Sequence, residues 1–165
     1  TAASAQGNEP YLFCYGLRSP DNIRQTADLL SKQLGCPIRS PHNPHRRWVE
    51  IGDTVYPDPG EWVSLIRNAR FVVTNSFHGT VFSLLFKKPF IVAGLTGDKA
   101  TANARALNLL RAVGLESRFA PAFSAQNTQA LMAREIDWAD VDQRLAELRQ
   151  AGNAFLNTQL KAVTA

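Results

Sequence analysis

A short polar segment, Asn75 to Gly79, interrupts two apolar runs in the sequence VVTNSFHGTVFSLL. Asn75 and Ser76 are residue types that cap the first turn of a helix, so we expect a strand to end and a helix to begin here. His78 would then lie in the first turn of that helix. Histidine is the side chain that most readily carries or shuttles a proton near neutral pH. The pattern therefore predicts acid–base chemistry at a helix start.

The same helix start is suited to hold an anion. The amides of the first turn have no partner within the helix, and the helix dipole places partial positive charge there. We expect Gly79 to leave these amides uncovered, so that a carboxylate or phosphate can approach the backbone. A capping box with a partly buried, hydrogen-bonded histidine is the alternative interpretation.

Short apolar runs alternate with helical patterns along the chain. Strands are expected within 11–17, 36–41, 49–56, 70–75 and 89–94. Helices are expected over 19–35, 60–69, 77–86, 101–115 and beyond 128, with a loop over 118–126. The last helix carries an apolar stripe, Val141, Leu145, Leu148, Phe155 or Leu156, and Leu160. Continuous apolar strands between helices predict a Rossmann-like α/β domain with a doubly wound parallel sheet, whose ligands bind beyond the carboxyl ends of the strands.

Composition indicates one domain. The 165 residues are 45% hydrophobic, which suits a single core over 11–165 behind a disordered leader, 1–10. The net charge of +4 suits an anionic small molecule but is too diffuse to indicate nucleic acid. No apolar run approaches the roughly 20 residues that span a bilayer. We expect a cytoplasmic protein with Cys14 and Cys36 as buried thiols, although a disulfide between two neighbouring strands is conceivable.

Several segments resemble one known family. TNSFHGTVFSLLFKKPF closely resembles the signature of the polysaccharide pyruvyl transferase family, and PGEWVSLIRNARFVV and NARALNLLRAVGLESRF are similar to its flanking segments. The tail RLAELRQAGNAFL is also similar, but Ala151, Gly152 and Asn153 stand where members commonly have a serine after the arginine. The resemblance extends from about Tyr11 to Leu156.

The resemblance implies the C-terminal half of a two-domain enzyme of the GT-B type. Its missing N-terminal domain would face this one across the active-site cleft. Similar proteins transfer the enolpyruvyl group of phosphoenolpyruvate to two hydroxyls of a sugar as a ketal. The acceptor is a bacterial-type surface polysaccharide or its lipid-linked precursor, which would bring the enzyme to a membrane surface peripherally. No cofactor and no metal are expected.

The resemblance also implies roles for particular residues. His78 matches the signature histidine and would be the catalytic acid or base. Relatives that write Arg-Leu-His at this place have an arginine for the anion, whereas this chain has Ser76, so the positive charge must come from elsewhere. The substrate-binding candidates are Asn75, Ser76, Gly79, Lys99, Arg105 and Arg18. Lys99 and Arg105 could instead be ordinary surface charges.

Two other functions stay open. A glycosyltransferase half that binds a nucleotide sugar would use the same fold and crevice. A non-catalytic domain would dock a partner through its C-terminal helix. The pair His42 and His45 lacks further ligands for a metal, and no P-loop, G-x-G-x-x-G or G-x-S-x-G motif is present.

Overall fold

The computed structural model describes residues 9–18, 21–44 and 49–163, with the side chains of 98–99 and 161–163 excepted. The expected leader therefore lies almost wholly outside the described residues. The strands are β1 (Leu12–Tyr15), β2 (Ile38–Pro41), β3 (Asp53–Val55), β4 (Phe71–Thr74), β5 (Phe90–Ala93) and β6 (Phe119–Ala120). The helices are α1 (Asp21–Leu34), α2 (Pro59–Asn68), α3 (Phe77–Leu85), α4 (Asn103–Ala112), α5 (Ala125–Ala133) and α6 (Trp138–Val163), with 3-10 turns η1 (Gly97–Ala102) and η2 (Glu116–Arg118).

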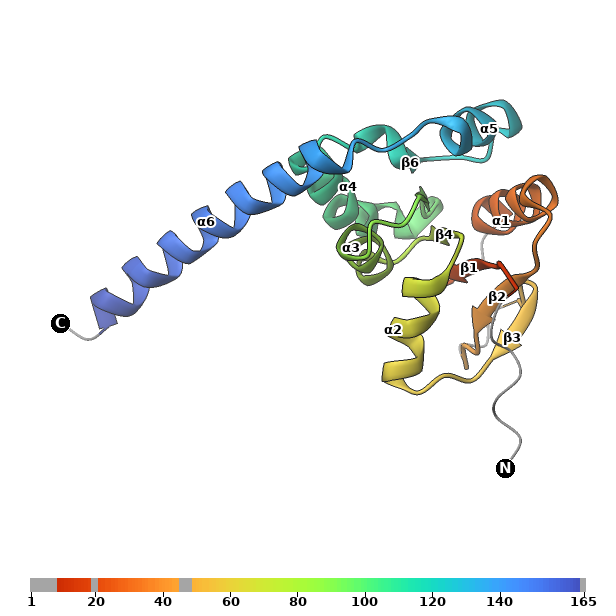
Figure 1. Cartoon of the computed structure of the whole chain (residues 1–165), viewed down its shortest axis with the longest axis horizontal. Helices are drawn as coiled ribbons and strands as arrows, with labels where there is room; N and C mark the ends of the chain where they lie inside the picture. The colour runs from red at the N-terminus through yellow and green to blue at the C-terminus, as the bar shows by residue number, and fades with distance from the viewer. Residues whose placement is uncertain (1–8, 19–20, 45–48, 164–165) are drawn as a thin grey trace.

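All six strands form one parallel sheet in the order β3-β2-β1-β4-β5-β6. The chain starts in the middle, runs outward to β3, and then crosses back to β4, so the strand order reverses between β1 and β4. In doubly wound sheets ligands bind at the carboxyl ends of the strands at this reversal. The predicted parallel, Rossmann-like fold is confirmed (Figure 1).

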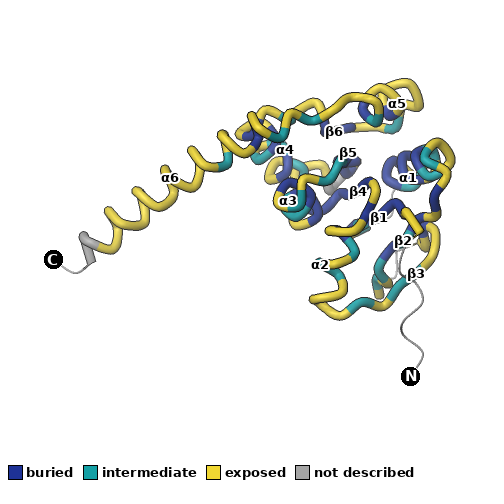
Figure 2. Tube along the Cα trace, in the orientation of Figure 1, coloured by how far each residue is buried: buried dark blue, intermediate teal, exposed yellow. Residues whose placement is uncertain are grey.

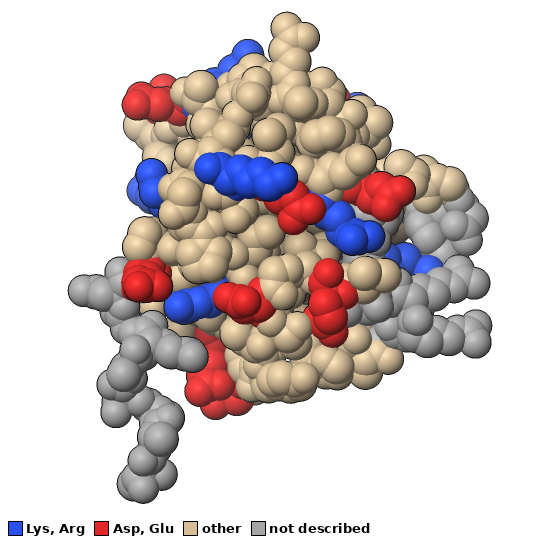
Figure 3. Space-filling model, turned by 90° about the vertical axis from the view of Figure 1, so that its right-hand side faces the viewer, with Lys and Arg blue, Asp and Glu red and all other residues tan. Residues whose placement is uncertain are grey.

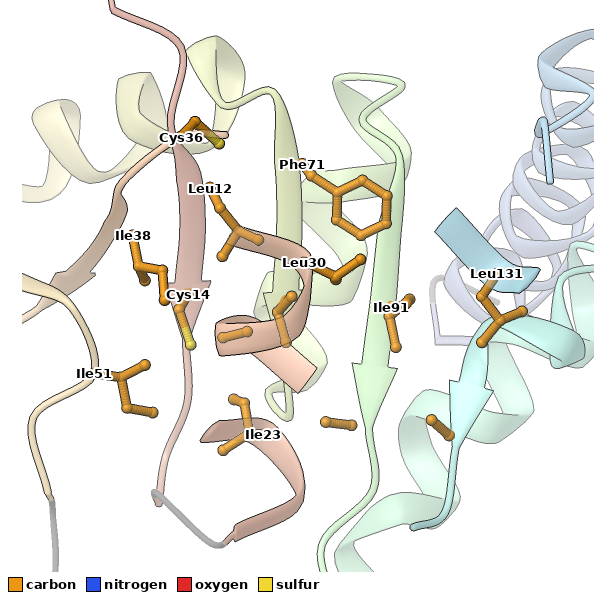
Figure 4. Packing of buried hydrophobic residues seen from close by; sticks show 14 residues of the cluster. Leu12, Cys14, Ile23, Leu30, Cys36, Ile38, Ile51, Phe71, Ile91 and Leu131 are labelled. Carbon is orange, nitrogen blue, oxygen red and sulfur yellow. The ribbon is translucent and has the colours of Figure 1, made fainter. Parts of the chain in front are cut away.

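Both faces of the sheet are covered, which explains why β4 and β5 are apolar at almost every position. One face packs against α1 and α5; Figure 4 shows Cys14, Ile23, Leu30 and Ile91 in this cluster. The other face packs against α2, α3, α4 and the first turns of α6. β4 and β5 are buried at all four positions each, because helices cover them on both sides.

Two sequence-based predictions about elements were wrong. The predicted loop over 118–126 contains β6, where Gly94 N donates to Ala120 O at 2.8 Å and extends the sheet by one strand. A strand of two residues is too short to show any periodicity. The apolar stripe of the last helix is also buried only at its start: Val141 is 1% exposed, whereas Phe155 is 63% exposed. Figures 1 and 2 show α6 extending away from the sheet with an exposed C-terminal part.

Arg118 is a buried charge with a structural function. It is 1% exposed, and its guanidinium donates to Leu131 O at 2.7 Å and to Arg134 O, two carbonyls at the C-terminal end of α5. Burial, with a smaller contribution from Arg134, lowers the pKa of Arg118 to about 10. The side chain therefore ends α5 in place of a helix cap.

Replacing Arg118 with methionine is expected to destabilise the protein by about 2 kcal/mol, because the buried Leu131 O and the partly buried Arg134 O lose their donor. The change is measured by urea unfolding. Arg111→Met serves as the control, since Arg111 pairs with Glu116 at 2.8 Å on the surface with both side chains more than half exposed. We expect no measurable shift for that variant. Equal midpoints for the two variants would contradict the capping function.

Candidate active site

The site forms where β1 and β4 end side by side. The register pairs Tyr15 with Thr74, so the two strands reach the carboxyl edge together. Thr74 Oγ1 donates to Tyr15 O at 2.6 Å and accepts from Ser76 N at 3.0 Å. This hydroxyl joins both strand ends to the start of α3.

Asn75 holds the loop that follows β1. Its Oδ1 accepts from Leu17 N at 2.9 Å, and its Nδ2 donates to Arg18 O at 2.8 Å. Gly16 lies against it, since a Cβ at Gly16 would be 3.0 Å from Asn75 Oδ1. The prediction that Asn75 could cap α3 was therefore wrong, because its amide is used to fix a loop 58 residues away along the chain.

Ser76 is the N-cap residue of α3 in backbone position only. Its side chain makes no hydrogen bond to the first turn, so the predicted side-chain cap is absent. The residue is 1% exposed, and Ser76 Oγ has no hydrogen-bond partner among the described residues. The N-terminus of α3 thus keeps first-turn amides that the serine does not satisfy, which is the property that favours an anion.

Gly79 has a different function from the one expected. It is buried, and a Cβ built on it would lie 2.2 Å from Thr74 Oγ1 and 2.9 Å from Thr74 Cβ. The missing side chain lets the first turn of α3 pack directly on the end of β4. The expectation that it uncovers the amides toward a ligand was wrong, since its open side faces Thr74.

His78 and Arg105 both lie against the ring of Phe77. His78 is exposed in the first turn of α3, with its ring centroid 6.0 Å from that of Phe77. The Arg105 guanidinium lies 4.5 Å from the centroid of the Phe77 ring. An imidazole and a positive charge therefore both lie against the first residue of α3. A guanidinium on an aromatic face is held in place without losing its charge.

Asn103 fixes the start of α4, the helix that carries Arg105. It was not among the site residues predicted from the sequence. Its Oδ1 accepts from Leu95 N at 2.9 Å and its Nδ2 donates to Leu95 O at 2.8 Å, which ties the start of α4 to the end of β5. Asn22 likewise ties the start of α1 to the ends of β5 and β6, since its Nδ2 donates to Gly94 O at 2.9 Å and to Ala120 O at 3.1 Å. An asparagine at the start of a helix was the available signal for each.

The remaining candidates are only partly placed. Arg18 follows β1 at the same edge, is half-buried, and contributes its carbonyl to Asn75. The backbone of Lys99 lies in η1 beyond β5, but its side chain is outside the described residues. The structure therefore brings together Asn75, Ser76, His78 and Arg105.

The cysteines do not contribute a nucleophile. Both are free and buried, which agrees with the expected pair of thiols; Cys36 lies just before β2 rather than in it. Burial, with a smaller contribution from Asp28, raises the pKa of Cys14 to about 12, so its thiol stays protonated. No three His, Cys, Asp or Glu side chains in the described part of the chain are grouped to hold a metal, and His45 lies outside that part.

Comparison with known families identifies the chain. The family model described as polysaccharide pyruvyl transferase matches residues 4–95, more than half of the 165 residues. The chain belongs to the polysaccharide pyruvyl transferase family. The match spans β1 to β5 and includes Asn75, Ser76 and His78, whereas Lys99 and Arg105 lie beyond it.

A solved structure supports the fold independently of the family. The chain resembles the UDP-GlcNAc 2-epimerase from Neisseria meningitidis, solved bound to UDP-GlcNAc, with a TM-score of 0.51 at 14% identity. The likeness covers 95% of this chain and 45% of the epimerase, so the chain spans less than half of that protein. At this identity the comparison shows the GT-B-like fold alone. No curated protein matches the chain in sequence.

The helices give no sign of a membrane span. α6 is the longest of the described helices, with 26 residues, but polar side chains recur along it. Within the described residues, no helix combines the length and the apolar character needed to cross a bilayer.

Proposed function

We propose that this domain binds phosphoenolpyruvate at the N-terminus of α3 and transfers its pyruvyl group to a sugar. The observation that carries the proposal is the buried, unpartnered Ser76 Oγ at a helix start that it does not cap, beside the exposed His78. An anion would take the place of the absent cap. Arg105 would supply the positive charge that relatives obtain from an arginine in the signature.

The chemistry needs the groups gathered at this edge. Protonation of the methylene carbon of phosphoenolpyruvate creates an oxocarbenium-like centre at the carbon that bears the phosphate. A sugar hydroxyl adds to that carbon and loses its proton, and the carbon–oxygen bond to phosphate breaks. A second hydroxyl of the same sugar then adds, loses its proton, and closes the ketal. His78 would donate the first proton and accept one of the later two.

Charge stabilisation would come from groups that are already fixed. First-turn amides of α3 and the Arg105 guanidinium would hold the carboxylate and the phosphate. Lys99 and Arg18 are proposed as additional cations. No separate cofactor and no metal are invoked. We also propose a cytoplasmic location at the site of glycan synthesis, with peripheral association with the membrane through a lipid-linked acceptor.

A second domain of the same enzyme is the proposed partner. The resemblance implies a facing N-terminal half, and the exposed apolar side chains of α6 are suited to contact it. Leu148 is 43% exposed, Phe155 63% and Leu156 57%. No charged residue occurs from Gln150 to Leu160, which is unusual for a helix surface that remains in water.

Binding of phosphoenolpyruvate tests the site directly. Titration of the isotopically labelled chain is expected to shift the amide signals of Phe77, His78 and Gly79. Arg105→Gln should weaken binding about tenfold, the effect of losing a charge-assisted hydrogen bond. Arg149→Gln, which removes an exposed positive charge on α6, is the matched control and should bind as the parent does.

The same titration with UDP-GlcNAc distinguishes the rival function. A nucleotide-sugar transferase would bind UDP-GlcNAc at this edge and ignore phosphoenolpyruvate. Tighter binding of the nucleotide sugar, or equal weakening of phosphoenolpyruvate binding by both arginine variants, would refute the proposal.

A further inference from the structure

A groove on the open edge of the sheet is not explained by the site at α3. It has a volume of about 860 Å³ and runs between α2, the strands β2 and β3, and the segment 9–11 that leads into β1. Figure 1 shows α2 beside this edge of the sheet. The lining residues that carry polar or aromatic groups are Tyr11, Arg39, Thr54, Tyr56, Glu61, Ser64 and Asn68.

The lining offers donors and acceptors side by side. Arg39 and Asn68 can donate, and Glu61 and Glu9 can accept. The Arg39 guanidinium lies 4.3 Å from the centroid of the Tyr11 ring and forms no ion pair with a described residue. Within the described part of the chain its N–H groups are therefore held in position without a carboxylate partner. On the face of the molecule that Figure 3 shows, charges of both signs are interspersed rather than gathered in a basic patch.

Aromatic surface stands next to these polar groups. Tyr56 is 76% exposed, and one of its faces stacks on His42 at a centroid distance of 5.0 Å. The second tyrosine, Tyr11, is only 6% exposed: its hydroxyl donates to Leu65 O at 2.8 Å, and the Arg39 guanidinium lies over its ring. Of the two tyrosines, Tyr56 is therefore the one with an open aromatic face. A pyranose has hydroxyls around its rim and an apolar C–H face, so it matches a lining of planar polar side chains beside the exposed ring of Tyr56.

We propose that this groove binds a neutral saccharide chain. Two carboxylates, Glu9 and Glu61, against one guanidinium, Arg39, disfavour an acidic ligand. The groove reaches the carboxyl end of β3 at Tyr56, the same edge of the sheet at which His78 follows β4, and α2 packs between the groove and α3. A glycan lying in the groove would extend toward the transfer site. Identification of that glycan with the acceptor rests on the proposed function, whereas the groove itself does not.

An array of immobilised oligosaccharides tests the inference without phosphoenolpyruvate. It holds neutral chains of glucose, galactose, mannose and their N-acetylamino forms, one to six units long, and matched chains containing uronic acids. The protein is expected to retain at least one neutral series, with binding that increases with chain length. Tyr56→Ala and Arg39→Gln should each lower that binding at least tenfold. Phe155→Ala, which removes an exposed ring on α6, should leave it unchanged.

The outcomes are decisive in both directions. Retention of acidic chains alone, retention of no chain, or equal binding by Tyr56→Ala, Arg39→Gln and the parent would overturn the proposal. Preference for a peptide library over all glycans would do the same. Thermal unfolding confirms that each variant is folded. The array contains no donor, so the two proposals are tested independently. A failed phosphoenolpyruvate titration would refute the transfer site but not the saccharide groove, and a failed array experiment would refute the groove but not the transfer site.

Discussion

Replacing His78 with glutamine is expected to lower kcat for pyruvyl transfer by about 10²–10⁴-fold, because glutamine can form hydrogen bonds but cannot transfer a proton. The side chain is exposed at the start of α3, so the free energy of unfolding should change by less than about 0.5 kcal/mol. The rate is measured as phosphate release from phosphoenolpyruvate with a glycan acceptor in the full-length enzyme.

The affinity for phosphoenolpyruvate separates catalysis from binding. The dissociation constant for phosphoenolpyruvate should stay within about threefold of the parent value, since α3 amides and Arg105 would hold the anion. A variant with full activity, or one that loses only donor affinity, would show that His78 is not the proton-transfer group.

Replacing Gly79 with alanine is expected to destabilise the protein by about 3 kcal/mol or more, at the upper end of what overpacking costs. The new methyl group would lie 2.2 Å from Thr74 Oγ1, and Thr74 is held by its hydrogen bonds to Tyr15 and Ser76, so it cannot move aside. The first turn of α3 must therefore shift away from β4. Thermal and urea unfolding measure the loss.

Gly152→Ala is the matched control in another helix. Gly152 lies in α6, and a Cβ there has no heavy atom within 4 Å. This variant should be more stable than the parent by about 0.5–1 kcal/mol, because alanine loses less backbone entropy in a helix. Similar effects of the two substitutions would mean that helix propensity, rather than contact with Thr74, decides the behaviour of Gly79.

Much of the architecture could be predicted from local patterns. The apolar run 11–17 predicted β1, and the spacing of apolar residues in 19–35 predicted α1 with its end before Gly35, which has φ +62°. Such patterns are local because a strand or helix shows its buried positions within a few residues. β6 and the function of Arg118 could not be predicted in this way. Both depend on contacts with β5 and α5 that leave no periodic signal.

In the candidate site, too, the local features could be predicted from the sequence and the long-range contacts could not. The sequence by itself determined that a strand gives way to a helix at Asn75 to Gly79 and that a histidine stands in the first turn. Only the tertiary structure decided how each polar group is used. Asn75 contacts a loop 58 residues away, Gly79 accommodates Thr74, and the Ser76 hydroxyl finds no hydrogen-bond partner among the described residues. The reason is that a side chain has few hydrogen-bonding groups, and the order of strands in the sheet determines which distant backbone atoms reach them first.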